Sequence, residues 1–199
     1  MILRPCLLAA CLTLSFLQGC VTHTPADYLT LRSPAQAVVR DDAAAISVGP
    51  VRLPDYLKRN SLARQDDKGH LHFSETEIWA EPLDRGLQRT LVEVLSDALG
   101  DTPVAWFPGQ PMVRTDYGVS VSVRLFEVTD SRVTLTATWR MLPTRADAPG
   151  ATISGRFRRE RALQQPSSGP EIAEALSELV QALALDIANA VPSRPSADA

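Results

Sequence analysis

Two stretches in the middle of the chain alternate between apolar and polar residues. Apolar side chains occupy every odd position in residues 117–125 and again in residues 133–141. A period of two places these side chains on one face of a β-strand. Thr129, Asp130 and Ser131 separate the two stretches as a turn, and a third strand is expected over residues 153–157. The pattern predicts an antiparallel meander with one apolar face and one polar face.

Two longer stretches have the period of an amphipathic helix. In residues 81–99, leucine recurs at every fourth position from Leu83 to Leu99; Pro82 stands in the first turn and Gly100 follows the last, as is typical of helix ends. In residues 168–191, apolar side chains form a second stripe, which Pro192 ends. Such stripes cover the apolar face of a sheet. We therefore expect an α+β fold, with a largely antiparallel sheet and two amphipathic helices packed on one face of it.

Shorter segments predict further strands at residues 28–31, 46–53 and 103–107, and a small hairpin formed by residues 62–64 and 71–73. Pro50 interrupts the strand at 46–53 and has no N–H for a ladder hydrogen bond. This strand is therefore expected to lie at a sheet edge or to contain a bulge. Trp79 directly precedes the first helix, where we expect it to pack as a hydrophobic staple.

The first nineteen residues have the pattern of a bacterial signal peptide. An apolar run from Leu7 to Leu17 follows Arg4 and is shorter than the roughly 20 residues that a membrane-spanning helix needs. The sequence Leu17-Gln18-Gly19-Cys20 resembles the lipobox, at which bacterial lipoproteins are cleaved and lipidated. We expect cleavage before Cys20 and a covalent acyl and diacylglycerol anchor on its thiol. The alternative is an ordinary secretory signal with an incidental cysteine.

The distribution of cysteines favours lipidation. Cys6 and Cys11 lie within the signal, so Cys20 is alone in the mature chain and has no partner for an intramolecular disulfide. Each buried CH₂ contributes about 0.8 kcal/mol, so several acyl chains hold a protein on a bilayer effectively permanently. Val21 follows the cysteine, where an aspartate would favour the inner membrane under the enterobacterial sorting convention. We expect the outer membrane, with the protein facing the periplasm.

The mature chain is expected to have three parts. Residues 20–26 form a lipidated tether, residues 27–191 form a single domain, and residues 192–199 form a small polar tail that is expected to be disordered. The tether spans at most about 20 Å, which keeps the domain close to the bilayer. With 20 basic against 23 acidic residues and a net charge of −3, the chain has no electrostatic footprint for nucleic acid.

The sequence contains no group of residues typical of an enzyme. It has no Gly-x-Ser-x-Gly elbow and no glycine-rich phosphate loop. His23 lies in the tether, and His70 and His72 lie at a loop tip without a third ligand, which predicts no metal site. Glu75 and Glu77 alternate on an exposed strand, which favours solvated side chains over an acid–base pair. We expect no catalysis, no metal and no cofactor apart from the covalent lipid.

Two segments are candidates for contact with a partner or with lipid. The first is a loop that contains Tyr56, Leu57, Lys58 and Arg59. Tyrosine and arginine are favoured at interfaces, although the loop also suits a purely structural turn. The second is a basic run that contains Arg156, Arg158, Arg159 and Arg161. It suits an acidic partner or anionic headgroups, or it protects an exposed strand from edge pairing.

Landmarks along nearly the whole mature chain resemble those of the ABC-type transport auxiliary lipoproteins. In chain order they are residues 17–20, 28–31, 46–51, 53–57, 59, 64, 79–83 and 133–139. The resemblance implies a role in lipid transport between two membranes, together with periplasmic MCE proteins and inner-membrane transport components. It also implies docking of the MCE assembly at the outer membrane by a homo-oligomer that performs no catalysis.

Two other functions suit an α+β lipoprotein of this size. One is a periplasm-facing carrier that binds one lipid in its own cavity. The other is a lipoprotein chaperone of an outer-membrane machine.

Overall fold

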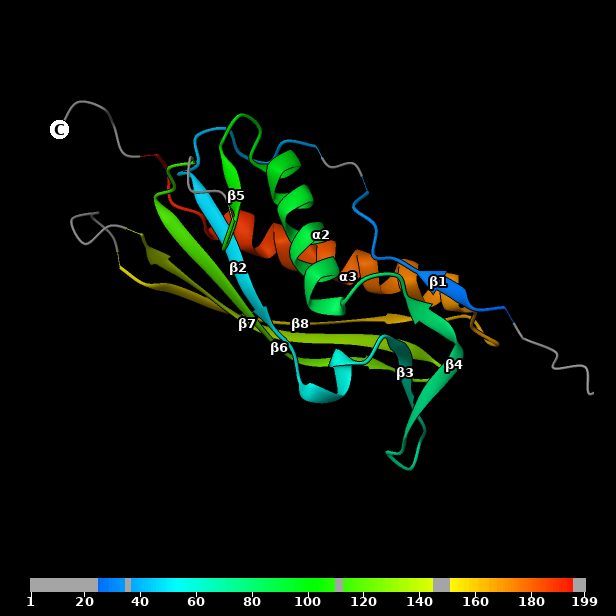
Figure 1. Ribbon diagram of the computed structural model, residues 1–199. Coiled ribbons are helices and arrows are strands. Elements are labelled where there is room, and N and C mark those ends of the chain that lie inside the picture. The colour runs from blue at the N-terminus through cyan, green and yellow to red at the C-terminus, as the bar shows by residue number, and fades with distance from the viewer. Residues whose placement is uncertain (1–24, 35–36, 110–112, 145–150, 195–199) are drawn as a thin grey trace, which may run out of the picture.

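A five-stranded sheet with two helices on one face forms the body of the protein (Figure 1). The computed structural model describes residues 25–34, 37–109, 113–144 and 151–194. The strand order of this sheet is β5-β2-β6-β7-β8. Its elements are β2 (Ile46–Arg52), α2 (Leu83–Ala98), β5 (Val104–Trp106), β6 (Tyr117–Val128), β7 (Arg132–Pro143), β8 (Ile153–Ala162) and α3 (Gly169–Ala190).

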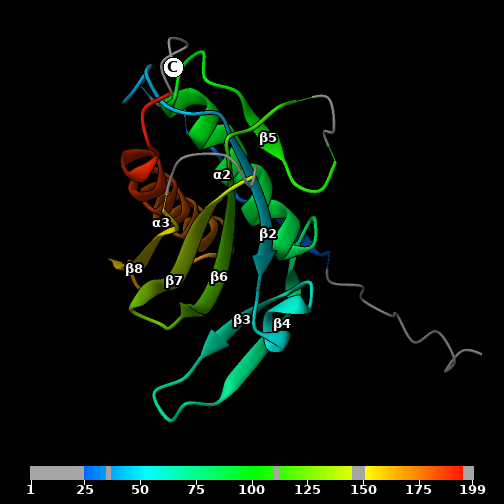
Figure 2. The same cartoon turned by 90° about the vertical axis from the view of Figure 1, so that its left-hand side faces the viewer.

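A second, three-stranded sheet lies beside β6 and extends away from the first (Figure 2). Its strands are β1 (Asp27–Leu29), β4 (Leu71–Trp79) and β3 (Ser61–Gln65), in that spatial order. A short 3-10 helix, η2 (Asp55–Lys58), connects β2 to β3. The sequence predicts only the tip of the β3–β4 hairpin. Strand β4 continues to Trp79, which is its last residue. The Trp79 side chain is buried, and its N–H donates to the carbonyl of Asn60 at 2.6 Å.

Both predicted helices are present, and their apolar stripes form the centre of the core. The leucine stripe of α2 and the stripe of α3 are at most 5% exposed. The members of the α3 stripe are Ile172, Leu176, Leu179, Val180, Leu183 and Ile187. The Ser168 side chain caps α3 by accepting from the Glu171 N–H at 3.4 Å. The predicted α+β fold, with both helices on one sheet face, is confirmed.

The predicted meander is confirmed, with one local difference. β6 pairs antiparallel with β7, and β7 with β8. The register of β6 shifts between Val123 and Leu125. An extra residue in a strand reverses the side-chain alternation beyond it, so Phe126 and Val128 are buried and Leu125 is not. The simple odd-position pattern is therefore wrong for Leu125.

Outside the meander, three strand pairs in the described part of the chain are parallel and only β3 with β4 is antiparallel. The expectation of a largely antiparallel sheet did not include these parallel pairs. β2 runs parallel to both β5 and β6, and β1 runs parallel to β4. A chain that returns over the sheet through a helix re-enters in the same direction, and α2 supplies that return before β5. β2 is therefore an interior strand. Its register shifts between Val48 and Val51, so Pro50 lies at an irregularity and not at an edge.

The ordered part of the chain reaches at least Arg194. The Pro192 carbonyl accepts from the Ala44 N–H at 2.8 Å, and the Arg194 N–H donates to the Asp42 carbonyl at 2.7 Å. Residues 195–199 of the predicted tail lie outside the described residues.

A glycine on β8 makes room for the one tryptophan of the meander, which leads to a stability prediction. A Cβ at Gly155 would lie 2.4 Å from the ring of its cross-strand neighbour Trp139. That ring is buried, and its Nε1–H donates to the Asp186 carboxylate on α3 at 2.9 Å. We expect Gly155→Ala to lower the free energy of unfolding by about 1–3 kcal/mol through overpacking, as measured by denaturant titration.

Gly118→Ala on β6 is the matched control. Its Cβ would meet no atom closer than 3.7 Å, and alanine is slightly favoured over glycine within strands. We expect this variant to be at least as stable as the wild type. Equal stability of the Gly155→Ala variant and this control would contradict the packing described here.

Candidate functional site

The described chain enters the domain through β1. We call residues 27–33 the anchoring segment, because the predicted lipidation site precedes them. Cys20, the predicted signal and most of the predicted tether lie outside the described residues, which begin at Pro25. β1 pairs with β4, and the Ala80 N–H donates to the Leu29 carbonyl at 2.8 Å. The side chains of Leu29 and Leu31 are buried in the core. Force on the N-terminus therefore reaches the domain through this short segment.

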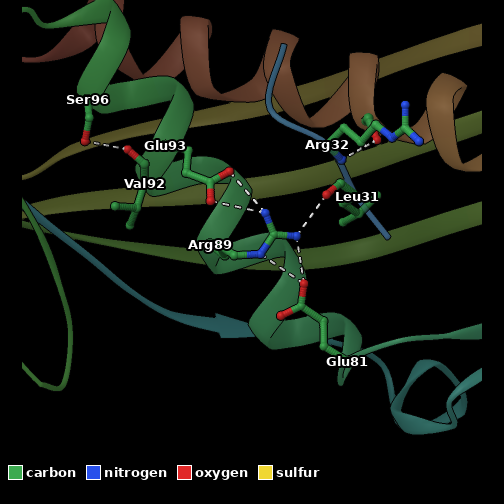
Figure 3. A network of polar contacts seen from close by, with 8 residues as sticks. Leu31, Arg32, Glu81, Arg89, Val92, Glu93 and Ser96 are labelled. Carbon is green, nitrogen blue, oxygen red and sulfur yellow. Dashed lines mark hydrogen bonds and ion pairs between the residues drawn. The ribbon is translucent and has the colours of Figure 1, made fainter. Parts of the chain in front are cut away.

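Arg89 of α2 holds the segment that follows β1 (Figure 3). Its Nη2 donates to the Leu31 carbonyl at 2.8 Å and to Glu81 Oε1 at 2.7 Å, while Nη1 donates to the Glu93 carboxylate at 3.1 Å. The Arg89 side chain is 29% exposed. A guanidinium presents its donors in a fixed fork, so these partners together fix its position. We call this network the Arg89 clamp.

A second contact joins the same segment to α3. The Arg32 N–H donates to Ser177 Oγ at 2.9 Å, and that hydroxyl donates to the Ala173 carbonyl at 2.6 Å. Ser177 is buried. Adjacent residues of the anchoring segment therefore bond to two different helices, which fixes this segment against the core.

The structure separates the four predicted contact residues near η2 into buried and exposed groups. Leu57 is 5% exposed and belongs to the hydrophobic core, so a partner has no access to it. Tyr56 is half-buried against the core; burial raises the pKa of its hydroxyl, which bonds to the backbone of Phe126 and lies near Glu127. Tyr56 and Leu57 therefore fit the alternative interpretation of this loop, namely a structural turn.

The two cations of this loop remain on the surface. Lys58 pairs with Asp55 at 2.5 Å, which lowers the pKa of that exposed carboxyl. Arg59 places its Cζ 4.6 Å from the centroid of the Phe73 ring. Both side chains have partners within the domain, so their positions alone do not indicate an external ligand.

Arg156 and Arg158 lie on the sheet face opposite the helices. β7 separates β8, which carries them, from β6, against which Tyr56 packs, so the structure does not bring the two predicted groups together. The intervening Phe157 is buried on the helix side. Arg161 also points to that side, where it pairs with Glu178 of α3 at 2.7 Å. The basic run is therefore divided between two faces.

The uncovered face carries two further arginines that were not among the predicted contact residues. They are Arg124 on β6 and Arg140 on β7, and both are exposed. Among the described residues, neither they nor Arg156 and Arg158 form an ion pair. Their signal in the sequence is their place in the polar phase of the alternating strands. We call these four residues the basic face.

An apolar groove adjoins the basic face at the β5 end of the sheet. Its volume is about 520 Å³, within the 300–1,000 Å³ typical of ligand sites. The side chains of Phe107, Val113 and Leu142 line it and are 52%, 37% and 46% exposed. Its floor contains Gly118 and Ser120 of β6. Leu142 stands where the strand pattern calls for a polar residue, and this was the signal available in the sequence.

Gln88 holds the wall of the groove in place. Its buried amide donates from Nε2 to the carbonyls of Val48 and Phe107, both at 2.8 Å. A Cβ at Gly49 would lie 2.2 Å from the Phe107 carbonyl oxygen, and Gly49 has a φ of +135°. Glycine is the residue that adopts this conformation without steric cost. The close approach of β2 to Phe107 thus depends on Gly49.

The histidines belong to a self-contained hairpin tip. The Asp66 carboxylate accepts from the His70 N–H at 2.8 Å and lies 3.0 Å from His70 Nδ1 and 3.3 Å from His72 Nε2. These contacts, the backbone bond first, hold the pKa of Asp66 far below its usual range. No group of three metal-ligating side chains suited to a metal ion occurs in the described parts of the chain.

The sequence matches the family described as ABC-type transport auxiliary lipoprotein component over residues 29–188. The chain belongs to this family. The matched range begins in β1 and ends in α3, so it includes the Arg89 clamp, the basic face and the groove. The auxiliary lipoprotein described here is therefore a component of a transport system.

Curated relatives agree with this assignment, and two solved structures share the fold. The chain is 27% identical over 155 residues to the intermembrane transport lipoprotein PqiC of Escherichia coli, covering 77% of this chain and 74% of PqiC. PqiC of Shigella flexneri matches equally well. A crystal structure from Xanthomonas campestris has the same fold, with a TM-score of 0.64, 17% identity and coverage of 81% of this chain and 91% of that one. A second crystal structure, of a protein without a described function, gives a TM-score of 0.67 at 24% identity and covers 84% of this chain and 99% of that one.

The Arg89 clamp of the auxiliary lipoprotein yields a prediction about its anchoring segment. Arg89→Ala removes the donor to the Leu31 carbonyl and leaves two carboxylates unpaired. Hydrogen bonds to charged groups contribute about 1.5–3 kcal/mol, and we expect the free energy of unfolding to fall by an amount of that order. Amide hydrogen exchange should accelerate most in residues 27–33.

Arg85→Ala is the control. Arg85 is exposed on the same helix and forms no ion pair with any of the described residues. If both variants exchange alike in residues 27–33, the clamp does not hold this segment.

Proposed function

We propose that this auxiliary lipoprotein is a non-enzymatic dock for the periplasmic MCE assembly of a lipid transport system. The observation that carries the proposal is the separation of two surfaces within one rigid domain. The anchoring segment lies at the β1 end, and the groove and the adjoining part of the basic face lie toward the other end of the five-stranded sheet (Figure 1). Family membership and the similarity to an intermembrane transport lipoprotein support this reading.

The dock is held on the outer membrane by lipid on Cys20 and faces the periplasm. None of the helices in the described part of the chain is long and apolar enough to cross a bilayer. The lipobox Leu17–Cys20 and the following Val21 support lipidation and outer-membrane location. The covalent lipid is the one non-protein group that this function needs. Several copies would form a homo-oligomer that meets the MCE protein, with inner-membrane transport components at its far end.

Lipidation is tested by Cys20→Ser. This change removes the thiol that takes the diacylglycerol group, so we expect an uncleaved or soluble protein that incorporates no labelled fatty acid. Metabolic labelling and membrane fractionation measure both effects. Unchanged labelling and membrane retention would exclude Cys20 as the anchor.

Docking is tested by co-purification from native membranes with an affinity tag on the C-terminus, away from the anchor. We expect the wild-type protein to enrich an MCE-domain protein, identified by mass spectrometry. The Cys20→Ser variant is the control. When this variant is mixed with the MCE protein in detergent, we expect the two proteins still to bind, because a direct contact between them does not need the lipid.

A monomer that enriches no MCE protein but retains close to one lipid per chain would contradict docking and favour the carrier function. Enrichment of an outer-membrane machine in place of an MCE protein would favour the chaperone function.

A further inference from the structure

The groove and the basic face form one continuous surface in the strand register. The rows across β6, β7 and β8 are Gly118 with Leu142, then Ser120 with Arg140 and Ser154, then Ser122 with Thr138 and Arg156, then Leu125 with Thr136 and Arg158. The first row lines the groove. Successive rows on one face lie about 7 Å apart. Starting from the groove, an arginine therefore occurs in each of the next three rows.

Within the described parts of the chain, no acidic side chain pairs with Arg140, Arg156 or Arg158. The carboxylate of Asp116 beside the groove accepts from the Ala45 N–H at 2.9 Å. Glu127 and Glu160 are the acids that neighbour the rows of the basic face, and both pair across β7 with Thr134, beyond the Arg158 row. The nearest cation to Glu160 is Arg132, at 3.9 Å. The rows of Arg140 and Arg156 contain no acid. The charge of these rows is therefore complementary to that of an acidic ligand.

The length of the surface indicates what kind of acidic ligand fits. A single phosphate headgroup can meet one arginine row, or two neighbouring rows at most. An extended polypeptide advances about 7 Å for every two residues, which equals the spacing of the rows. One apolar side chain in the groove, followed by acidic side chains at alternate positions, matches all four rows.

The position of the groove favours a protein that arrives from the periplasm. In Figure 1 the strand β1, near which the described chain begins, lies at one end of the molecule and β5 toward the other; β5 supplies part of the groove lining. A tether of about 20 Å holds the β1 end near the bilayer. The groove then opens away from the headgroups of the anchoring membrane, toward the side from which a periplasmic partner approaches.

We infer that the groove and the basic face together bind an extended segment of the docked partner, with an apolar anchor residue followed by acidic residues at alternate positions. This inference rests on the proposed function and names the contact surface for it. Phe107, Val113 and Leu142 receive the apolar anchor. Arg140, Arg156 and Arg158 bind the successive carboxylates, where each charge-assisted hydrogen bond is stronger than a neutral one.

A designed peptide tests this surface without the natural partner. The probe is a fluorescent peptide with one Phe and three Asp at alternate positions after it, separated by Ser. It is titrated by fluorescence anisotropy against the mature lipoprotein in nanodiscs of zwitterionic lipid. We expect saturable binding that weakens as salt is raised. Replacing the three Asp by Asn, or the Phe by Ser, should abolish it.

Two variants of the protein separate the two halves of the surface. Arg140→Gln removes the first cation, and we expect affinity for the probe to fall at least about tenfold. Gly118→Val fills the floor of the groove; its Cβ has room, with Ser47 Oγ at 3.7 Å and Thr144 Cγ2 at 3.8 Å, so the fold should persist. Arg159→Gln is the matched control, because this exposed arginine follows Arg158 on β8 but belongs to the opposite face.

Each outcome decides the inference separately from the docking function. Equal probe binding by the wild type and both test variants, each with unchanged circular dichroism, would overturn it. So would normal co-purification of the MCE protein by the Gly118→Val, Arg140→Gln double variant, although docking itself would then stand. A photoreactive phospholipid that labels the groove and is not displaced by the peptide would also overturn it. Arginine-dependent probe binding, in a wild type that enriches no MCE protein, would support the surface and reject the proposed function.

Discussion

The burial of one sheet face beneath α2 and α3 is the constraint on which the rest of this structure depends. Helix α2 packs over β2 and β5, and helix α3 packs over β7 and β8. Most of the fully buried large side chains belong to the two helices, β2 and β7. Burial of a leucine or isoleucine stabilises a fold by about 1.5–3 kcal/mol, so this interface dominates the stability. The helices leave the other face uncovered, and residues that meet a partner must lie there or at the ends of the sheet.

The polar contacts described above act on geometry more than on stability. The Arg89 clamp and the Ser177 bond fix a segment of a few residues, and the Gln88 amide fixes the groove wall. Each of these contacts contributes little to the free energy of unfolding in comparison with the core. Their importance is that they join irregular segments to helices that the core has already immobilised. An anchor and a contact surface on flexible loops would have no defined orientation to the membrane.

The sequence predicts the regular parts of this fold well because their hydrophobic period is undisturbed. The leucine stripe from Leu83 to Leu99 and the odd positions from Val133 to Met141 are buried as the periodicity indicates. It fails where one residue changes the phase, as at the bulge before Leu125. It also fails where pairing is non-local, as with the parallel strands around β2, because periodicity along one strand carries no information about its neighbours.

The candidate surface shows the same limit. The closeness of Arg156 and Arg158 in sequence predicts a shared surface, whereas Arg140 joins them only through the register of β7 with β8. Leu57 was grouped with Lys58 by sequence, but one turn of η2 directs it into the core. The groove combines residues from β5, β6 and β7, so no local pattern contains it.

Gln88 and Arg89 are consecutive residues of α2, and successive side chains of a helix point about 100° apart. One of them holds the wall of the groove, and the other holds the segment that follows β1. A single helix therefore fixes the groove and the point where the chain enters the domain relative to each other. The distance between these two places is set by one turn of helix, whatever the length of the chain that precedes β1.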